Sequence, residues 1–196
     1  MINVVSSSNP SRRGKPATRR TLLSRRDGMT AEQRAEASSL IAARAAEQLA
    51  RINPGEVVAL YAAKGSEVET AAIDVAARGC GLRVVYPRVV EGERVLVFAE
   101  AGQADLVTGK FGLREPSGPS VALDEIAAFC VPGVAFDREG GRIGWGRGHY
   151  DATLALVPKA LRIGVAFECQ VVDAVEHEEH DARMHVIVTE VATHVV

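Results

Sequence analysis

The sequence predicts an α/β domain built in layers around a largely parallel sheet. Short apolar runs alternate with helix-compatible segments along most of the chain, which is the pattern of such domains. Its 196 residues suffice for one domain with a sizeable core. Hydrophobic residues make up 47% and charged residues 24%, as is usual in globular proteins. This composition excludes a collagen-like chain, wholesale disorder and a small disulfide scaffold.

Two helices are expected first. Residues 1–14, rich in serine with a proline and a glycine, are predicted to be a flexible tail. A basic helix follows over residues 16–26 and ends at an Asp-Gly pair. Thr30 can cap the next helix, with Gln33 in the capping-box position, and the alanine-rich pattern continues to about Arg51.

The rest of the chain alternates strands and helices. Helices are expected over residues 68–78 and, at the end of a glycine-rich segment, over 149–156. A proline after residue 86 is expected to end one strand, and residues 112–119 are expected to be a loop. The predicted strands cover residues 57–61, 82–86, 94–98, 126–131, 163–167 and 184–189.

The charge is distributed unevenly. Residues 1–26 contain seven basic residues and no acidic one, so the remaining chain, with 16 basic and 25 acidic residues, carries a formal −9. A basic N-terminus could bind nucleic acid, a membrane surface or the phosphates of a small ligand. Only nine aromatic residues are present and no basic surface continues the run, so we expect no nucleic-acid partner.

Targeting signals are weak. No run of 18 apolar residues exists, and no apolar stretch follows Arg12 and Arg13, so we expect neither a membrane span nor export. The arginine-rich start also resembles a mitochondrial presequence, although the cytoplasm is the expected location. Cys80, Cys130 and Cys169 are widely spaced and form no CxxC pair, which indicates reduced thiols without a zinc site.

The glycine-rich segment over residues 140–151 is the densest chemical signal. Its alternate glycines permit positive φ angles, so successive backbone N–H groups can converge on an anion. Arg142 and Arg147 could add charge-assisted hydrogen bonds to phosphate. Asp151 could then hold a magnesium ion that bridges phosphates. The alternative is a flexible surface loop with incidental glycines.

Standard motifs do not account for this segment. The two Gly-Lys pairs lack the Ser or Thr of a Walker A loop, and His149 stands where a dinucleotide fingerprint needs glycine or alanine. His177 and His180 are three residues apart rather than four, so they do not form the zinc-binding HExxH motif. Gly-x-Ser-x-Gly is absent.

Several landmarks in order carry a family resemblance. They are the basic start with Lys15 and Arg19, then EVET at 67–70, FGLREP at 111–116, VPGVAFD at 131–137, the glycine-rich segment through Tyr150 and Asp151, and HD at 180–181. Over about residues 15–190 the sequence resembles the 5-formyltetrahydrofolate cyclo-ligase family. The resemblance implies one cyclo-ligase domain over 15–196, with a Rossmann-like sheet of the isomerase and CoA-transferase type and helices on both faces.

The implied reaction is the ATP-dependent cyclisation of 5-formyltetrahydrofolate to 5,10-methenyltetrahydrofolate, with release of ADP and phosphate. It implies ATP as co-substrate, Mg²⁺ as cofactor, no membrane partner and a monomer. Lys15 and Arg147 are expected to be catalytic, and Asp151 and Asp181 to hold the metal. The expected nucleotide-binding residues are Lys15, Arg19, Arg142, Gly144, Trp145, Gly146, Arg147, Gly148, His149 and Tyr150, and the expected folate-binding residues are Ala62, Glu67, Arg147, His149 and Tyr150.

Departures from the family pattern keep two alternatives open. His149 stands where a tyrosine is common, and Trp145, Arg147 and Thr18 also differ from the usual residues. A divergent relative acting on another formyl or amide substrate would explain these changes. A non-catalytic protein that binds nucleotide or folate, or one whose basic tail binds nucleic acid, is the other alternative.

Overall fold

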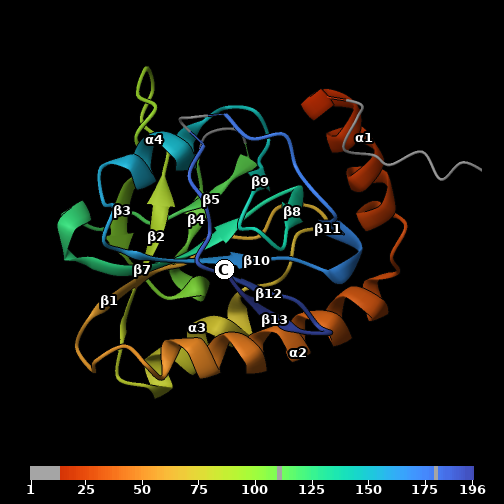
Figure 1. The fold of residues 1–196 in the computed structure, drawn as a ribbon. Coiled ribbons are helices and arrows are strands. Elements are labelled where there is room, and N and C mark those ends of the chain that lie inside the picture. Colours follow the sequence, from red (N-terminus) through yellow and green to blue (C-terminus); the bar gives the residue numbers. More distant parts are fainter. Residues whose placement is uncertain (1–13, 110–111, 179–180) are drawn as a thin grey trace, which may run out of the picture.

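A computed structural model of the chain describes residues 14–109, 112–178 and 181–196. It is an α/β layered structure in which helices flank one large sheet, as the sequence predicts (Figure 1). The strands of this sheet lie in the order β13-β12-β10-β7-β1-β2-β3-β6. Their bounds are β1 Val57–Ala59, β2 Arg83–Arg88, β3 Val97–Glu100, β6 Ser120–Val121, β7 Ile126–Pro132, β10 Leu161–Val165, β12 Val186–Val188 and β13 Thr193–Val195.

The five central strands, from β12 to β2, are parallel, whereas β13, β3 and β6 pair antiparallel at the two edges. The longest parallel register joins β10 to β7, from the Leu161–Ala128 pair to the Val165–Pro132 pair. After β1 the chain moves one strand outward to β2, and later returns to the opposite side of β1 as β7. Ligands of open α/β sheets bind at the carboxyl ends of strands where the order reverses in this way.

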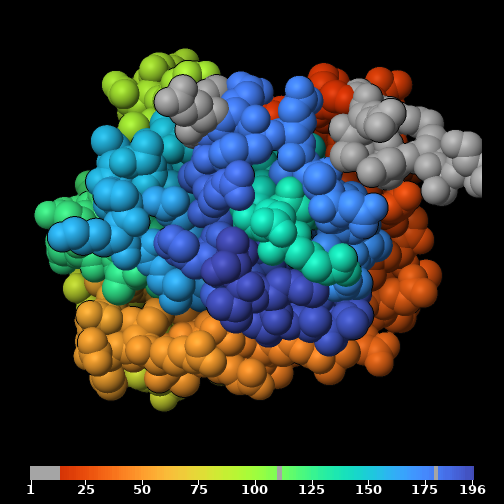
Figure 2. Space-filling view, viewed as in Figure 1, coloured from red at the N-terminus to blue at the C-terminus, as the bar shows by residue number. Residues whose placement is uncertain are grey.

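Helices cover both faces of the sheet (Figure 1). On one face α2 and α3 bury Ile41, Leu49 and Ile73 against it, and on the other α4 buries Leu154 near Phe129. Figure 2 shows α2, in orange, packed beneath the carboxyl-terminal strands, in dark blue. The helix bounds are α1 Gly14–Asp27, α2 Ala31–Leu49, α3 Ala71–Gly79 and α4 His149–Ala155.

The local signals for the first two helices are confirmed. Thr30 accepts a hydrogen bond from the Gln33 amide, and the Gln33 side chain accepts one from the Thr30 amide, so the capping box is complete. The strand expected to stop before Pro87 instead continues to Arg88. On the β1 side, β2 is paired only over residues 83–85, so no strand lies beside Pro87 there. The N–H group that proline lacks is therefore not needed for a hydrogen bond to β1.

Short strands outside the main sheet were not predicted. One three-stranded sheet joins β11-β8-β9, and a two-stranded antiparallel sheet joins β4 to β5, of which β5 lies inside the expected loop over residues 112–119. Asp137 fixes the turn after β8, because its carboxylate accepts hydrogen bonds from the amides of Gly141 and Val175 at 2.7 and 2.8 Å. The bounds are β4 Val107–Thr108, β5 Arg114–Glu115, β8 Ala135–Asp137, β9 Arg142–Ile143 and β11 Val171–Val172, with short 3₁₀ helices at Gln103–Asp105, Leu123–Glu125 and Glu168–Gln170.

Two of the sequence expectations concern residues that the structure does not describe, and a third concerns membrane helices. Of the expected tail, residues 1–13 lie outside them, and Gly14 begins α1. His180, the second histidine of the motif rejected above, also lies outside them. Among the described residues, no helix is long and apolar enough to cross a membrane.

Candidate active site

A pocket of about 970 Å³ opens at the reversal of strand order. Tyr61 and Ala62, which follow β1, and Pro132, which ends β7, form its floor. The glycine-rich segment and the start of α1 supply two further walls. All of the site residues expected from the sequence line this one pocket, namely Lys15, Arg19, Ala62, Glu67, Arg142, Gly144, Trp145, Gly146, Arg147, Gly148, His149, Tyr150, Asp151 and Asp181.

The glycine-rich segment has a fixed course. Gly146 and Gly148 have φ angles of 90° and 69°, which favour glycine over other residues. At Gly144 a Cβ atom would lie 2.8 Å from Nη1 of Arg142, so a side chain at this position would displace the guanidinium group. The Gly144 carbonyl accepts a hydrogen bond from Nε of Arg19 at 2.8 Å, which ties the segment to α1.

Arg142 and Asp151 form a buried ion pair. The Nη2 atom of Arg142 lies 2.6 Å from Oδ1 of Asp151, and the arginine side chain is only 4% exposed. The same carboxylate oxygen accepts the amide of Ala182 at 3.3 Å, so the segment after Asp181 lies directly against it. Among the described residues, Nε of Arg142 is buried without a hydrogen-bond partner.

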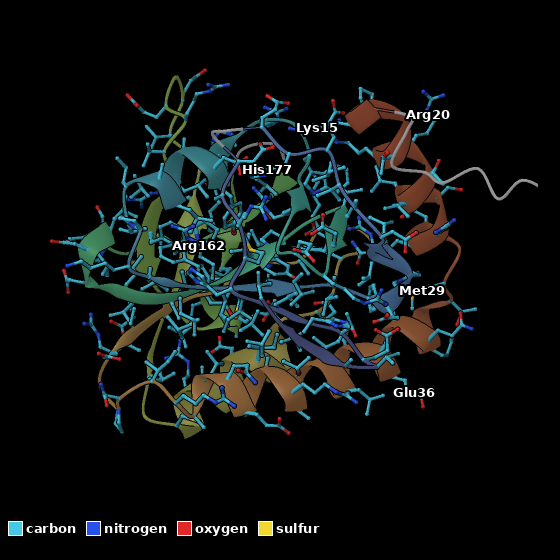
Figure 3. All side chains as sticks on the ribbon, viewed as in Figure 1. Lys15, Arg20, Met29, Glu36, Arg162 and His177 are labelled. Carbon is cyan, nitrogen blue, oxygen red and sulfur yellow. The ribbon has the colours of Figure 1, made fainter. Side chains whose placement is uncertain are left out.

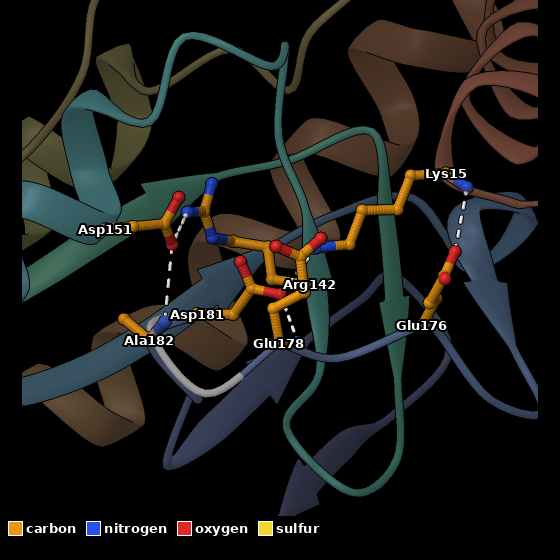
Figure 4. Close-up of polar contacts among 7 residues, drawn as sticks. All are labelled: Lys15, Arg142, Asp151, Glu176, Glu178, Asp181 and Ala182. Atoms are coloured by element: carbon orange, nitrogen blue, oxygen red, sulfur yellow. Dashed lines mark hydrogen bonds and ion pairs between the residues drawn. The ribbon is translucent and has the colours of Figure 1, made fainter.

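A second set of charges surrounds Lys15. Its Nζ donates to Oε1 of Glu178 at 2.6 Å and to Oδ2 of Asp181 at 2.7 Å, and its backbone amide donates to Glu176 (Figure 4). Lys15 points from α1 toward the molecule, whereas Arg20 on the same helix points outward (Figure 3). Burial lowers the pKa of Lys15, but the hydrogen bonds to Asp181 and Glu178 outweigh it and raise the pKa overall.

Glu67 and Trp145 meet on another wall of the pocket. The indole Nε1 of Trp145 donates to Oε1 of Glu67 at 2.8 Å, and the backbone amide of Lys64 donates to Oε2 at 2.9 Å. Burial raises the pKa of Glu67, and the Trp145 hydrogen bond only partly offsets this effect. The arrangement presents a carboxylate beside an aromatic ring, which suits a flat heterocycle with N–H donors.

Two ring residues begin α4. The hydroxyl of Tyr150 is buried without a hydrogen-bond partner among the described residues, and burial raises the pKa of this group strongly. Nδ1 of His149 lies 2.9 Å from the carbonyl oxygen of Arg94. Because a carbonyl only accepts, Nδ1 carries the hydrogen and Nε2 remains available for other contacts.

The sequence analysis missed several residues of the pocket. Arg26, Lys64, Arg94 and Arg114 also line it, so among the described residues eight basic side chains face five acidic ones. This excess of positive charge favours an anionic ligand. Arg26 stood within the basic N-terminal run, but nothing in the sequence placed Arg94 or Arg114 near the glycine-rich segment.

Fold and pocket together define a class. The chain is an α/β protein with a cationic pocket, of a size for small molecules, at the switch point of a parallel sheet. In this pocket, backbone amides beside glycines and basic side chains can hold phosphate. A carboxylate and aromatic rings can hold a heterocycle.

Comparison with known proteins narrows this class to one family. The model of the 5-formyltetrahydrofolate cyclo-ligase family matches residues 11–190, and the chain belongs to that family. The 5-formyltetrahydrofolate cyclo-ligase of Mycolicibacterium smegmatis is 32% identical over 144 residues, which are 69% of this chain and 74% of the relative. That of Escherichia coli K12 is 28% identical over 175 residues, which are 84% and 94% of the two chains.

Solved structures agree with this assignment. The Aquifex aeolicus 5,10-methenyltetrahydrofolate synthetase covers 92% of this chain with 92% of its own, at a TM-score of 0.79 and 28% identity. The Mycoplasma pneumoniae 5,10-methenyltetrahydrofolate synthetase, at 21% identity and a TM-score of 0.74, shares the fold. The layered α/β fold expected from the sequence is therefore confirmed.

Proposed function

We propose that this chain closes the ring of 5-formyltetrahydrofolate to give 5,10-methenyltetrahydrofolate, with conversion of ATP to ADP and phosphate. Family membership carries the reaction type. One structural observation carries the location, because a single pocket gathers the residues that the family resemblance selects from four distant parts of the chain.

The chemistry needs activation by phosphate. The N5-formyl group is amide-like, so its carbon is a weak electrophile and its oxygen a poor leaving group. Attack of the formyl oxygen on the γ-phosphorus of ATP releases ADP and forms a phosphorylated imidate. N10 of the folate then attacks the formyl carbon, loses its proton, and expels phosphate that retains the formyl oxygen. The protein contributes positioning and charge neutralisation.

The basic wall of the pocket would hold the nucleotide. Lys15, Arg19 and the amides of residues 144–148 are proposed to contact its phosphates, with Trp145, His149 and Tyr150 beside them. Lys15 and Arg147 are the proposed catalytic cations, because they would neutralise charge on the transferring phosphoryl group. The buried Arg142 supports this wall through its ion pair with Asp151.

The part of the pocket around Glu67 would hold the folate. The carboxylate of Glu67 could accept N–H groups of the pterin, while the rings of His149 and Tyr150 provide flat contact surfaces. Ala62, a small residue directly after β1, leaves room for the ring system. Arg147 would reach both ligands and is therefore also assigned to the folate.

Asp151 and Asp181 are the proposed magnesium ligands. Both line the pocket, and the amide next to Asp181 touches Asp151, so two hard oxygen donors lie close together. Among the described residues no cluster of three or more His, Cys, Asp or Glu could hold a metal, which fits a cation that keeps several waters and phosphate oxygens. When bound, Mg²⁺ would neutralise phosphate charge, and Lys15 would have to exchange Asp181 for phosphate.

An absorbance time course tests the function. The protein is mixed with 5-formyltetrahydrofolate and magnesium, and ATP is added last. Growth of the near-ultraviolet methenyl band only after ATP supports the proposal. A flat trace from a protein that turns over ATP with another formyl compound favours the divergent relative, and binding without any turnover favours the non-catalytic protein.

Three further assignments are also proposals. We infer a monomer, which light scattering coupled to size-exclusion chromatography would test, and a cytoplasmic enzyme, which fractionation would test. We also propose no nucleic-acid partner. Filter binding of nucleic acid to the full chain would be measured over a range of salt concentrations. Tight binding at low salt that weakens steeply as salt increases would contradict this proposal.

A further inference from the structure

Arg26 is a buried arginine in the basic helix α1, at the four-residue spacing that also buries Thr18 and Leu22. Only 2% of it is exposed, whereas the neighbouring Arg25 and the preceding Arg20 are exposed. Arginine is almost never fully buried unless it is paired, because removal of its charge from water is costly. Its burial at the edge of the pocket therefore indicates specific partners.

The partners of Arg26 lie on the pocket wall. Its Nε donates to the hydroxyl of Ser66 at 2.9 Å, and that hydroxyl in turn donates to Asp27. Its guanidinium carbon lies 5.5 Å from the centre of the Trp145 ring, within the range of a cation–π contact. One side chain thus links the segment before Glu67 to the glycine-rich segment.

Trp145 needs this support. It lies between Gly144 and Gly146 and is 50% exposed, so its own segment restrains it weakly. Its indole donates to Glu67, whose other oxygen is held by the Lys64 amide. The contacts form a continuous path from Arg26 through Trp145 to the Glu67 carboxylate.

We propose that Arg26 is a positioning residue that stacks on Trp145 and, through it, holds Glu67 in the orientation that receives the folate. This inference rests on the proposed function for its kinetic part, although the stacking itself is independent of any substrate. Arginine suits this position better than lysine because a planar guanidinium can stack on a ring and hydrogen-bond in its own plane at once.

The charges around Glu67 give the proposal an electrostatic consequence. The groups that face its carboxylate are Arg26 from α1, Lys64 from its own segment, Tyr61 after β1 and Tyr150 in α4. Burial raises the pKa of Glu67, and Arg26 and Lys64 act against this increase. Loss of the Arg26 charge therefore moves the acidic limb of folate binding to higher pH.

The test uses Arg26→Lys and Arg26→Gln in the full chain, with Arg25→Lys and Arg25→Gln as matched controls. Trp145 is the only tryptophan, so intrinsic fluorescence reports its surroundings without any label. Emission spectra and acrylamide quenching are measured without substrate. KM and kcat are then measured separately for 5-formyltetrahydrofolate and for ATP between pH 5 and 9.

In both Arg26 variants we expect altered Trp145 emission and stronger quenching. KM for 5-formyltetrahydrofolate should rise about fivefold or more, and by a larger factor than KM for ATP, because Glu67 is assigned to the folate alone whereas Trp145 also lies beside the proposed nucleotide site. Only Arg26→Gln should shift the acidic limb of the pH profile upward. The Arg25 variants should match the unsubstituted protein in every readout.

Unchanged fluorescence and an unchanged folate KM in folded Arg26 variants would overturn the proposal, and so would an equal rise in both KM values. If the Arg26 variants do not fold, Ser66→Ala removes the hydrogen bond that orients the guanidinium and should produce the same changes at smaller size, and its absence of effect would also overturn the proposal. Failure of the unsubstituted protein to form methenyl product would refute the proposed function instead, while the fluorescence measurement would still decide whether Arg26 holds Trp145.

Discussion

The ion pair between Arg142 and Asp151 gives the most detailed prediction. Asp151→Asn keeps the shape of the side chain and an oxygen that can accept hydrogen bonds, but removes the negative charge. The Arg142 side chain is 4% exposed and Asp151 20% exposed, so water replaces the lost charge of the partner only in part. The guanidinium also donates from Nη1 to the carbonyl oxygen of Pro132, at 3.3 Å.

The size of the effect follows from this burial. Removal of one partner from a buried pair destabilises a protein by about 3–5 kcal/mol. Because asparagine can still accept from Arg142 and from the Ala182 amide, the lower end, about 3 kcal/mol, is expected. For a chain of this length, that corresponds to a decrease of about 6–12 °C in melting temperature.

Thermal unfolding followed by circular dichroism at pH 7, without ligands, measures this change. Asp173→Asn, the same substitution at an exposed position, is the control and should leave the melting temperature within about 1 °C. A decrease below about 2 °C for Asp151→Asn would refute the assigned role of the pair. At a temperature where the variant is folded, turnover should fall at least about 100-fold if Asp151 also holds magnesium.

Three further substitutions separate binding, pH dependence and backbone geometry. In the absorbance assay for methenyl product, Lys15→Met should raise KM for ATP and lower kcat about 100-fold. The melting temperature should change little, because Lys15 is only partly buried. Unchanged kinetics would show that Lys15 is not catalytic. The pKa of Glu67 is raised above its ordinary 4.5, so the contribution of this residue to stability is complete below pH 4.5 and is lost as the pH rises through the folded-state pKa. Glu67→Gln should therefore weaken folate binding and unfold at a higher temperature than the unsubstituted protein at pH 7 but not at pH 4. Equal melting curves at both pH values would contradict this. Gly146→Ala, at a φ of 90°, should destabilise by about 1–2 kcal/mol in urea unfolding, whereas Gly79→Ala, where the added carbon meets open space, should not; similar loss in both would show that the φ angle of Gly146 is unimportant.

Locally determined features were the ones that the sequence predicted well. The Thr30–Gln33 capping box depends on neighbours in sequence, and the continuous apolar run of β7 depends on burial on both faces. By contrast, β8, β9 and β11 have two or three residues each. Strands this short are too brief to show a periodicity, and β11 in addition pairs with β8 from a distant part of the chain.

The site followed the same division. The glycine-rich segment could be identified because its repeated glycines indicate by themselves a backbone with positive φ angles. Arg26 could not, because an arginine in a basic helix is normally solvated, and its partners Ser66 and Trp145 lie far from it in the sequence. Likewise, Lys15 and Asp181 were assigned to different ligands, while the structure pairs them with each other.

The fate of one oxygen atom tests the central claim most directly. 5-Formyltetrahydrofolate labelled with ¹⁸O in the formyl group is mixed with the protein, magnesium and ATP, and the released phosphate is analysed by mass spectrometry. The account predicts one labelled oxygen in each phosphate, formed together with methenyltetrahydrofolate. Methenyl product accompanied by unlabelled phosphate would contradict direct phosphorylation of the formyl oxygen, and absence of the product would contradict the assigned reaction itself.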